Sequence, residues 1–525
     1  MSESDQSRSI EALDSGRHRR PKPLDAAPLD PEQCYRVLRT RDRRFDGRFF
    51  VGVRTTGIFC RPICPAPPPK SDNCTYWPSA AAAQGAGFRP CLRCRPEAAP
   101  GTPAWNGTAA SVSRALRLIE AGGLDGDGNV DELAERLGIG SRHLRRLFDQ
   151  HLGATPLAVA KMRRTLFAKQ LIDETTLSMT EIALSAGFSS QRRFNACLRE
   201  VYGRPPSELR RRGTAATRKP SRARARDGRA GQEKEAIELS LPYRPPLAWE
   251  ELLAFFAPRA IPGVEWVDGG CYFRTIRTPG GVGSIAVRHD ETKGRLRVAL
   301  RVPASDGLIE VSTQLRQLFD LDADAESIDE ALAQVDLFRA HVAQRPGLRV
   351  PGAFDGFETA VRAILGQQIS VKGATTLAGR IAARFGKRLP RRFAQHESLG
   401  FGFPRPKALL HAELEELGIV SARADTIRGL ARAVLDDPGL LHPGPSLVAD
   451  LERWVALPGI GPWTAHYVAM RVLREPDALP ASDLGLRKAI SKPDEEIRPA
   501  SDVEAVLESC RPYRAYAAMR LWAML

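Results

Sequence analysis

The stretch Leu457-Pro-Gly-Ile-Gly-Pro-Trp-Thr-Ala465 decides the fold of the C-terminal half of this chain. Its two glycines predict a tight turn that exposes backbone N–H groups at the start of a helix, and such a turn can hold a phosphate without any side chain. An acid, Asp483, follows 22 residues after Gly461. The stretch therefore predicts a helical hairpin that binds phosphate, with a carboxylate close behind it.

Length and charge limit what the whole chain can be. A chain of 525 residues is too long for one hydrophobic core, so we expect three or four domains. Lysine and arginine number 77 against 62 acids, and the net charge of +15 favours nucleic acid as a partner, with mere solubility charge as the alternative. Since no long apolar run and no apolar leader occur, we expect no membrane segment and a protein of the cytoplasm.

Composition and periodicity divide the chain into segments. The polar start predicts a disordered leader, and a later stretch rich in basic residues predicts a flexible linker that can also touch DNA phosphates. The predicted fold is multidomain and mainly α with α+β. We expect a leader at 1–30, a cysteine-bearing domain at 31–105, a helical domain at 106–209, the linker at 210–235, an α+β sheet domain at 236–350 and a second helical domain at 351–525.

Two pairs of cysteines predict a metal site. Cys60-Arg-Pro-Ile-Cys64 and Cys91-Leu-Arg-Cys94 each let two thiolates face one tetrahedral ion, so the four together predict a closed zinc site with four cysteine ligands. A purely structural zinc is the default interpretation of such a site. Cys74 lies outside both pairs and is expected to be a small buried hydrophobe that does not bind the metal.

The residues around these cysteines carry a resemblance. Val53-Arg-Thr-Thr-Gly-Ile-Phe-Cys60-Arg-Pro and Gly87-Phe-Arg-Pro-Cys91-Leu-Arg-Cys94 resemble the methyl-acceptor domain of the Ada family. The resemblance implies that Cys60 takes a methyl group irreversibly from a methylated DNA phosphate and that the loss of one negative charge then raises the affinity for DNA. Zinc keeps such a thiol deprotonated while leaving it nucleophilic.

Two helix-turn-helix units follow. Val130 to Phe148 has the form helix, glycine-containing turn, helix, and Thr180 to Gly203 repeats it. The word Ala183-x-x-Ala-Gly-Phe-x-Ser resembles the AraC-type regulators. This implies binding to promoter DNA and transcription activation, with RNA polymerase as a further partner, whereas a solvated helical bundle is the alternative. The residues expected to reach phosphates or bases in the major groove are Arg142, Arg145, Arg192 and Arg193.

The hairpin belongs to a longer resemblance. Together with Gly356 to Val371 and with Leu241-Pro-Tyr-Arg-Pro-Pro246, it resembles the helix-hairpin-helix DNA glycosylases, most closely the AlkA-type 3-methyladenine glycosylases. The resemblance implies double-stranded DNA with an alkylated, flipped base as substrate, Asp483 as the catalytic carboxylate, and Gly459 and Gly461 at a DNA phosphate. One acid suffices because an alkylated purine is already a good leaving group. An N-cap role for Ser482 or Asp483 is the plain alternative.

Aromatic residues and absent groups narrow the expected reaction. Trp463, Tyr467, Trp522 and Phe255 match the family's pocket, where stacking and cation-π attraction favour a cationic base. Because Trp463 stands where strand-cutting members carry a lysine, the resemblance implies excision without strand cleavage. An iron-sulfur cluster needs four closely spaced C-terminal cysteines, and since only Cys510 is present we expect none. The resemblance allows a monovalent cation at the hairpin.

Two positions depart from the family pattern. Gln368 stands where the family has an apolar wedge that fills the vacated base stack, and we assign it to DNA contact. Leu484 replaces an aromatic residue beside the aspartate, which we expect to alter the range of substrates. A regulator with a decayed glycosylase half and a glycosylase with a tethering N-terminal half are the rival hypotheses. Repair of O6-methylguanine is not predicted, because this sequence has no counterpart of the Pro-Cys-His-Arg motif of the methyltransferases that perform it.

Overall fold

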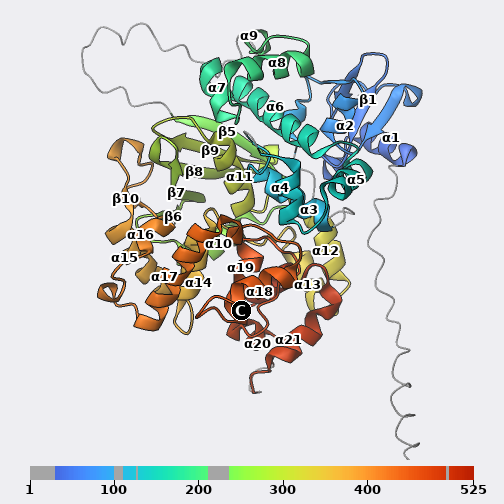
Figure 1. Ribbon diagram of the computed structural model, residues 1–525. Coiled ribbons are helices and arrows are strands. Elements are labelled where there is room, and N and C mark those ends of the chain that lie inside the picture. Colours follow the sequence, from blue (N-terminus) through green and yellow to red (C-terminus); the bar gives the residue numbers. More distant parts are fainter. Residues whose placement is uncertain (1–29, 100–109, 126–127, 211–235, 492–495) are drawn as a thin grey trace, which may run out of the picture.

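The computed structural model describes residues 30–99, 110–125, 128–210, 236–491 and 496–525 (Figure 1). Apart from Asp30 and Arg210, the predicted leader and the predicted linker lie outside these residues. Among the helices of the described part, none is long and apolar enough to cross a membrane.

A small sheet holds the cysteine-bearing domain together. Its strand order is β3-β1-β2-β4, and β2 runs parallel to β4 with Phe59 opposite Pro90. The residues that follow this pair are Cys60 and Cys91, so the register brings one cysteine of each pair to the same place. The elements are α1 (Pro31–Thr40), β1 (Phe50–Val53), β2 (Ile58–Cys60), β3 (Cys74–Trp77), α2 (Ala80–Gly85) and β4 (Arg89–Pro90).

The first helical domain contains both predicted helix-turn-helix units. Side chains cap their helices as the sequence favours: Asn129 accepts from the N–H of Glu132, and Ser178 forms a capping box with Glu181. Leu144 and Phe194 anchor the second helix of each unit in the core. The elements are α3 (Ala110–Glu120), α4 (Val130–Arg136), α5 (Ser141–Leu152), α6 (Pro156–Glu174), α7 (Met179–Ser185), α8 (Gln191–Tyr202) and α9 (Pro206–Leu209).

The sheet domain has one antiparallel sheet of order β5-β9-β8-β7-β6. Successive side chains of a strand point to opposite faces. On β7, Tyr272 and Ile276 therefore join the core under the neighbouring helices, whereas Phe273 packs on Leu389 and Phe393 of the next domain. The elements are β5 (Ile237–Pro242), α10 (Trp249–Phe256), β6 (Glu265–Asp268), β7 (Cys271–Thr278), β8 (Gly281–Asp290), β9 (Arg295–Arg301), α11 (Leu308–Leu318), α12 (Ala325–Ala333) and α13 (Asp336–Gln344).

Helices with a short two-stranded ribbon make up the C-terminal domain. The buried apolar side chains of these helices form one large core that includes Phe357, Trp454 and Tyr516. The whole arrangement confirms the predicted fold class, mainly α with one α+β sheet domain. The elements are α14 (Gly356–Leu365), α15 (Val371–Phe385), β10 (Lys387–Arg388), β11 (Phe401–Gly402), α16 (Pro406–Leu409), α17 (Ser421–Asp436), α18 (Leu447–Val455), α19 (Pro462–Arg471), α20 (Leu484–Ala489), α21 (Ala500–Leu507) and α22 (Arg514–Ala523).

A buried ion triad fastens the N-terminal half to the C-terminal domain. On α3, Arg114 and Arg117 hold the carboxylate of Glu475 at 3.0 and 2.8 Å, and each of the three side chains is less than a tenth exposed. Arg117 also donates to the carbonyl oxygens of Leu473, at 3.1 Å, and Arg474, at 2.6 Å. These residues form the turn just after α19, so α3 is anchored at the end of that helix.

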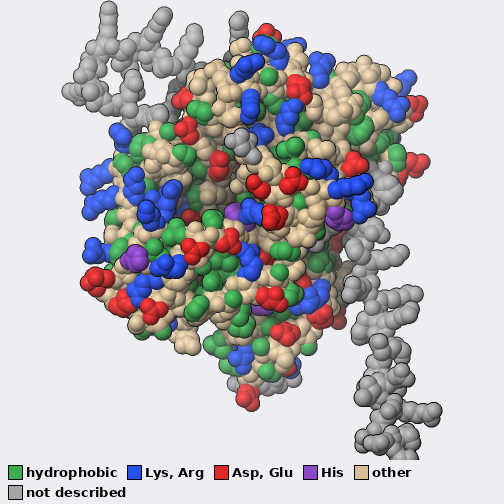
Figure 2. All heavy atoms as spheres, viewed as in Figure 1, with side chains coloured by type: hydrophobic (Ala, Val, Ile, Leu, Met, Phe, Trp, Pro, Cys, Tyr) green, Lys and Arg blue, Asp and Glu red, His purple; other side chains and the backbone are tan. Residues whose placement is uncertain are grey.

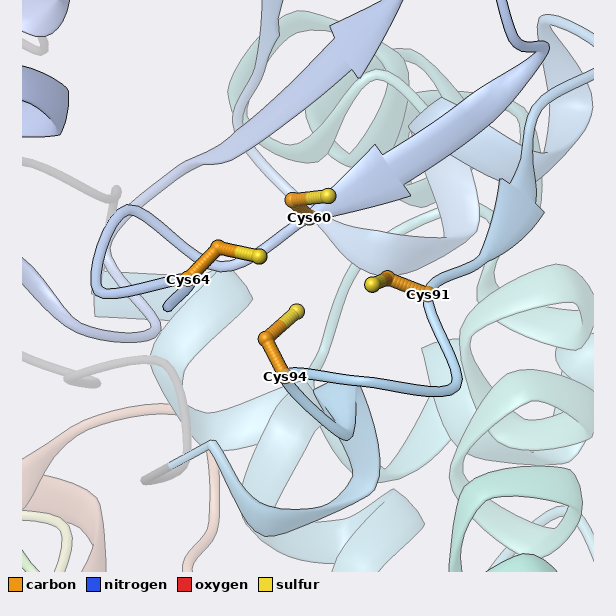
Figure 3. A group of neighbouring side chains, drawn as sticks. All are labelled: Cys60, Cys64, Cys91 and Cys94. Carbon is orange, nitrogen blue, oxygen red and sulfur yellow. The ribbon is translucent and has the colours of Figure 1, made fainter. Parts of the chain in front are cut away.

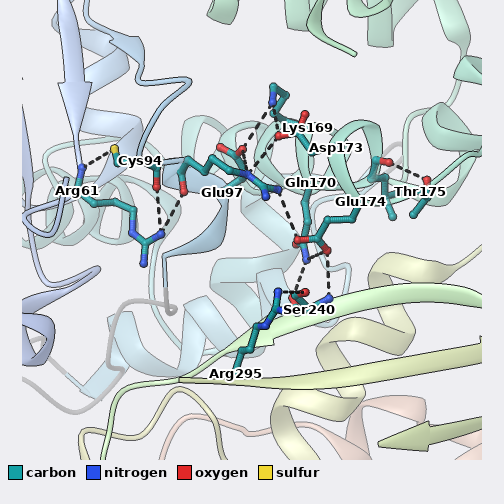
Figure 4. Close-up of polar contacts among 12 residues, drawn as sticks. Arg61, Cys94, Glu97, Lys169, Gln170, Asp173, Glu174, Thr175, Ser240 and Arg295 are labelled. Carbon is teal, nitrogen blue, oxygen red and sulfur yellow. Dashed lines mark hydrogen bonds and ion pairs between the residues drawn. The ribbon is translucent and has the colours of Figure 1, made fainter. Parts of the chain in front are cut away.

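A second polar network leads from the cysteines to the sheet (Figure 4). Arg95, next to Cys94, pairs with Glu174 of α6 at 3.5 Å, and the N–H of Ser240 on β5 donates to Glu174 at 3.1 Å. Gln170 also donates to the Ser240 carbonyl oxygen, at 2.7 Å. Around this network one apolar cluster continues from the cysteine-bearing domain through α6 and α8 into the sheet domain. The two halves therefore share a core.

Candidate functional sites

The four predicted zinc ligands point toward one centre (Figure 3). Their sulfur atoms all lie within 4.8 Å of one another. A tetrahedral zinc ion with Zn–S distances of about 2.3 Å places its sulfurs about 3.8 Å apart, so the group fits the ion. The backbone N–H groups of Arg61 and Arg93 donate to Cys94 and Cys91 at 3.3 and 3.4 Å, which stabilises thiolates.

Cys60 differs from the other ligands in its exposure. Cys64, Cys91 and Cys94 are 4, 8 and 7% exposed, whereas Cys60 is half-buried. Taken as a whole residue, Cys60 is therefore the most exposed of the four. Cys74 is buried and does not belong to the group of four.

The four arginines that the sequence predicts to contact DNA lie on the exposed faces of α5 and α8. Arg142 and Arg145 are exposed on α5, and Arg192 and Arg193 are exposed at the start of α8. Within the described residues none of these four forms an ion pair with a carboxylate, so their charge is directed at solvent. The opposite faces of both helices are buried, which fixes the direction in which the arginines point.

Gly459 and Gly461 shape the hairpin between α18 and α19 in different ways. Gly459 has a φ of +83°, and a Cβ there would lie 1.9 Å from Oγ1 of Thr426. Only glycine fits this position. Gly461 is the N-cap of α19, no side chain caps that helix, and a Cβ on Gly461 would meet nothing within 4 Å. The positive end of α19 thus faces an open space that suits an anion.

The turn between α14 and α15 is tied to the hairpin. Gln367 donates from Nε2 to the Gly459 carbonyl oxygen and to Oγ1 of Thr464, both at 3.0 Å. Gln368 beside it is exposed at the tip of the turn with a φ of +57°. Sequence reasoning missed Gln367, and its place next to the predicted tip was the only signal. Hairpin and tip are therefore held as one unit.

Asp483 caps a helix and faces a cleft at the same time. Its Oδ1 accepts from the backbone N–H of Leu486 at 3.1 Å, which makes it the N-cap of α20. Oδ1 also accepts from the indole N–H of Trp522 at 2.9 Å, and Oδ2 accepts from that of Trp463 at 3.0 Å. From the sequence, an N-cap and a site carboxylate were alternative interpretations of Asp483. In the structure Asp483 is the N-cap of α20 and also lines the cleft.

A cleft of about 340 Å³ brings together the predicted pocket residues Phe255, Trp463, Tyr467, Trp522 and Asp483. The rings of Trp463 and Tyr467 stack with centroids 5.2 Å apart and planes 14° apart. The pair thus forms a short aromatic stack that lines the cleft together with the carboxylate. A planar ring inserted from outside can extend such a stack.

Arginines that sequence reasoning missed also line the cleft. The guanidinium of Arg259 lies 4.0 Å from the ring centre of Phe255, and that of Arg471 lies 4.9 Å from it. Arg471 also donates to the hydroxyl of Tyr467 at 2.6 Å. Burial alone would raise the pKa of Tyr467, but the charges of Arg471, Arg259 and Arg362 outweigh it and lower that pKa. The arginines thus fix the position of both aromatic rings.

Four family models match the chain in order. Residues 33–97 match the metal binding domain of Ada, and residues 133–212 match a helix-turn-helix domain. Residues 238–355 match the AlkA N-terminal domain, and residues 361–512 match the HhH-GPD superfamily of base excision DNA repair proteins. The resemblances seen in the sequence are confirmed.

Relatives support the same order of parts. The chain is 42% identical to a protein of Mycobacterium tuberculosis named probable bifunctional transcriptional activator/DNA repair enzyme AlkA, across 94% of this chain and 97% of that protein. It is 31% identical to DNA-3-methyladenine glycosylase 2 of Escherichia coli, across 54% of this chain and 96% of that one. It is 32% identical to the E. coli bifunctional transcriptional activator/DNA repair enzyme Ada, across 36% of this chain and 51% of that one. The chain therefore belongs to the AlkA-like bifunctional transcriptional activators and DNA repair enzymes, in which an Ada-type zinc domain and an AraC-type helix-turn-helix domain precede a DNA glycosylase.

Proposed function

We propose that the C-terminal half hydrolyses the N-glycosidic bond of alkylated purines, with 3-methyladenine as the leading substrate, and leaves an abasic site. The observation that carries this proposal is the carboxylate of Asp483, held by two indole N–H groups at the edge of an aromatic cleft. The flipped base stacks in the cleft against Trp463 and Tyr467. Phe255 and Trp522 complete its walls.

The bond then breaks with the electron pair passing to the base. The sugar acquires positive charge, which the carboxylate of Asp483 stabilises. The same carboxylate orients the water that adds to the sugar carbon and takes up the proton that this water loses. An indole has no amine that can attack this carbon, so Trp463 supports hydrolysis without strand cleavage. Leu484, 52% exposed beside Asp483, is proposed to affect which bases are accepted.

DNA contacts surround this cleft. The open N-terminus of α19 after Gly461 is proposed to hold a phosphate, with Gly459 shaping the turn. Gln368 at the exposed tip is proposed to enter the space that the flipped nucleotide leaves, where its amide can hydrogen-bond to the base left unpaired. A monovalent cation at the hairpin stays a prediction.

Release of 3-methyladenine from a methylated duplex by the full-length protein tests the enzyme. We expect the wild type to release the base, Asp483→Asn to release none, and the neighbouring Ser482→Ala to retain activity. The strand should stay intact until alkali cleaves the abasic site. A wild type that releases no base contradicts the glycosylase, and a nick without alkali contradicts hydrolysis without strand cleavage.

We further propose that Cys60 accepts a methyl group from a methylphosphotriester in DNA. The half-buried position of Cys60 supports this role. Zinc bound by the four cysteines would keep the sulfur of Cys60 deprotonated. That sulfur attacks the methyl carbon, an S–C bond forms, the C–O bond breaks, and the electron pair stays on the phosphate oxygen as a diester.

Loss of negative charge at Cys60 then raises the affinity for DNA. The exposed arginines of α5 and α8 are proposed to contact promoter phosphates and bases: Arg142, Arg145, Arg192 and Arg193. RNA polymerase is the proposed further partner.

Mass spectrometry after incubation with methylated DNA tests the acceptor. We expect one methyl group on the peptide that contains Cys60, the same adduct in Cys74→Ser, and none in Cys60→Ala. If no cysteine of the wild type gains a methyl group, the N-terminal half is a structural zinc module that tethers DNA.

A further inference from the structure

A row of basic side chains runs along α15 and continues onto β10 and the segments next to the ribbon of β10 and β11. Between residues 380 and 411 the chain has eight lysines and arginines and one acid, Glu397. These eight and Lys372 near the start of α15 are all exposed, and we name them the basic track. The basic track consists of Lys372, Arg380, Arg384, Lys387, Arg388, Arg391, Arg392, Arg405 and Lys407.

The basic track starts beside the proposed lesion site. Lys372, Arg380 and Arg384 lie on the ridge of α15 that is formed by every fourth residue, while Ala374 and Ala378 face the core. Lys372 follows the exposed tip Gln368 by four residues. Because the turn of Gln368 is bound to the hairpin, the near end of the basic track has a fixed place at the base-binding cleft.

Among the described residues, the charges of the basic track have no acidic partners. Within the described part of the chain, no ion pair joins one of these side chains to a carboxylate, whereas surface arginines nearby are paired, for instance Arg428 with Glu415 at 2.7 Å. Unscreened like charges repel one another, so such a set is stabilised by a polyanion. Figure 2 shows Lys and Arg side chains gathered at the edge of the molecule where Figure 1 labels β10.

Aromatic rings support part of the basic track. The guanidinium groups of Arg384, Arg388 and Arg392 lie 5.8, 5.9 and 4.8 Å from the ring centres of Phe385, Phe401 and Phe393. A guanidinium over a ring keeps its N–H edges free for planar recognition of phosphate oxygens. Three guanidinium groups of the basic track are therefore positioned over aromatic rings, on α15, on β10 and in the turn that follows β10.

We propose that the basic track binds the phosphate backbone of the duplex on one side of the lesion and so extends the DNA footprint of the glycosylase. This rests on the proposed place of the lesion at Gln368. The 15 residues of α15 span about 22 Å, which corresponds to about six base pairs at roughly 3.4 Å each. The ribbon thus meets phosphates about six base pairs from the flipped nucleotide.

Binding of the full-length protein to a duplex with one abasic-site analogue tests this surface. The test variant carries Lys387→Gln, Arg388→Gln, Arg391→Gln and Arg392→Gln. The control carries Arg288→Gln, Lys293→Gln, Arg297→Gln and Arg339→Gln, which remove the same charge from exposed positions on the sheet domain and α13. The duplex arms on each side of the analogue are lengthened in turn from about four to about twelve base pairs. The shorter arm thus ends before, and the longer arm beyond, the distance of about six base pairs that α15 spans.

We expect the wild type and the control to bind about tenfold more tightly when one particular arm is lengthened, and the test variant to lose this gain. The slope of log Kd against log salt should fall by about 0.9 for each phosphate contact removed. On alkylated DNA, the kcat/KM of the test variant should fall below that of the wild type only when the duplex carries the lengthened arm. The single-turnover rate of the test variant at saturation should stay unchanged.

Equal Kd values and salt slopes for the test variant and the control would overturn the proposal, as would a wild type for which neither arm matters. Failure of the proposed glycosylase is distinguishable, because it abolishes base release in every variant while the binding comparison on the abasic duplex still reports on the basic track. Equal melting temperatures of all variants confirm that they are folded.

Discussion

Asp483 has all of its strongest contacts with neutral donors. One indole comes from α19, the other from α22, and the backbone N–H of Leu486 completes the set. Hydrogen bonds to a charged acceptor are stronger and more directional than those to a neutral one. The carboxylate is therefore fixed in orientation before a substrate enters the cleft.

Replacing Trp522 with phenylalanine tests this orientation. The variant keeps an aromatic ring but removes the hydrogen bond to Oδ1, which for a charged acceptor contributes about 1.5–3 kcal/mol. We expect the single-turnover rate of base release to fall by about 10- to 100-fold with little change in melting temperature. Trp266→Phe, at an exposed indole of the sheet domain, is the control and should keep the wild-type rate. An unchanged rate in Trp522→Phe would contradict an orienting role.

His466 predicts a pH dependence of stability. Its Nδ1 accepts from the backbone N–H of Leu479 at 3.2 Å, and burial, with a smaller contribution from Arg514, lowers its pKa from 6.5 to about 4. The folded state thus prefers the neutral ring. The stabilisation is complete above pH 6.5 and is lost as the pH falls from there towards 4.

Melting curves at several pH values measure this effect. We expect the melting temperature of the wild type to fall more steeply between pH 6.5 and 4 than that of His466→Asn, whose amide oxygen can accept the same hydrogen bond without titrating. Parallel profiles for the two proteins would assign the pH dependence to other groups.

At the scale of elements, the hairpin and the neighbouring turn act as one unit. Gln367 donates to both sides of the hairpin, and Arg423 of α17 donates to the Gln367 carbonyl oxygen at 2.7 Å. Two elements that contact DNA in the proposed complex are therefore locked together in the free protein. This arrangement lowers the ordering cost of binding.

Gly459→Ala should break this unit. The new methyl group would overlap Oγ1 of Thr426, and the positive φ adds roughly 1–3 kcal/mol of strain. We expect the affinity for a lesion duplex and the rate of base release to fall by at least about tenfold. Titration of DNA binding measures the loss.

Two further variants separate clash from strain. Gly459→Ala combined with Thr426→Ala should recover part of the affinity, because the overlap is gone while the strain remains. Gly461→Ala should fold and melt as the wild type does, since its backbone φ is −92° and its Cβ would meet no atom within 4 Å. A double variant as weak as Gly459→Ala would show that the overlap is not the cause.

Local signals explain how much of the fold could be predicted from the sequence. Glycines, capping residues and short spacings predicted the hairpin, the helix-turn-helix units and the cysteine pairs, because each of these is decided within a few residues. Gln367 meets Gly459 across 92 positions, and Arg471 meets Phe255 across an even longer separation. No periodicity records such pairs, so the support around the site became visible only in three dimensions.

At the scale of the whole molecule, the buried triad of Arg114, Arg117 and Glu475 predicts that the halves unfold cooperatively. Glu475→Gln leaves two buried guanidinium groups without their counter-charge, and breaking a buried pair costs about 3–5 kcal/mol. We expect the free energy of unfolding by denaturant to fall by this amount. Denaturation followed by circular dichroism measures it.

An exposed pair in the same half provides the control. Glu200→Gln removes the partner of Lys161, which lies at 2.7 Å with both side chains about half exposed, and should cost at most about 1 kcal/mol. Replacing all three members of the triad by methionine should restore part of the stability. The interpretation fails if Glu475→Gln and Glu200→Gln are equally stable.

The shared core has a consequence for how the chain can be divided. Apolar side chains of the cysteine-bearing domain, of α6 and α8, and of the sheet belong to one cluster, and the triad lies across a second contact of the same two halves. The peptide that joins residue 210 to residue 236 is therefore not what keeps the halves together. Cutting it should leave two complementary fragments that stay associated as a heterodimer. Two genes that each encode one fragment should therefore assemble the same structure when they are expressed together.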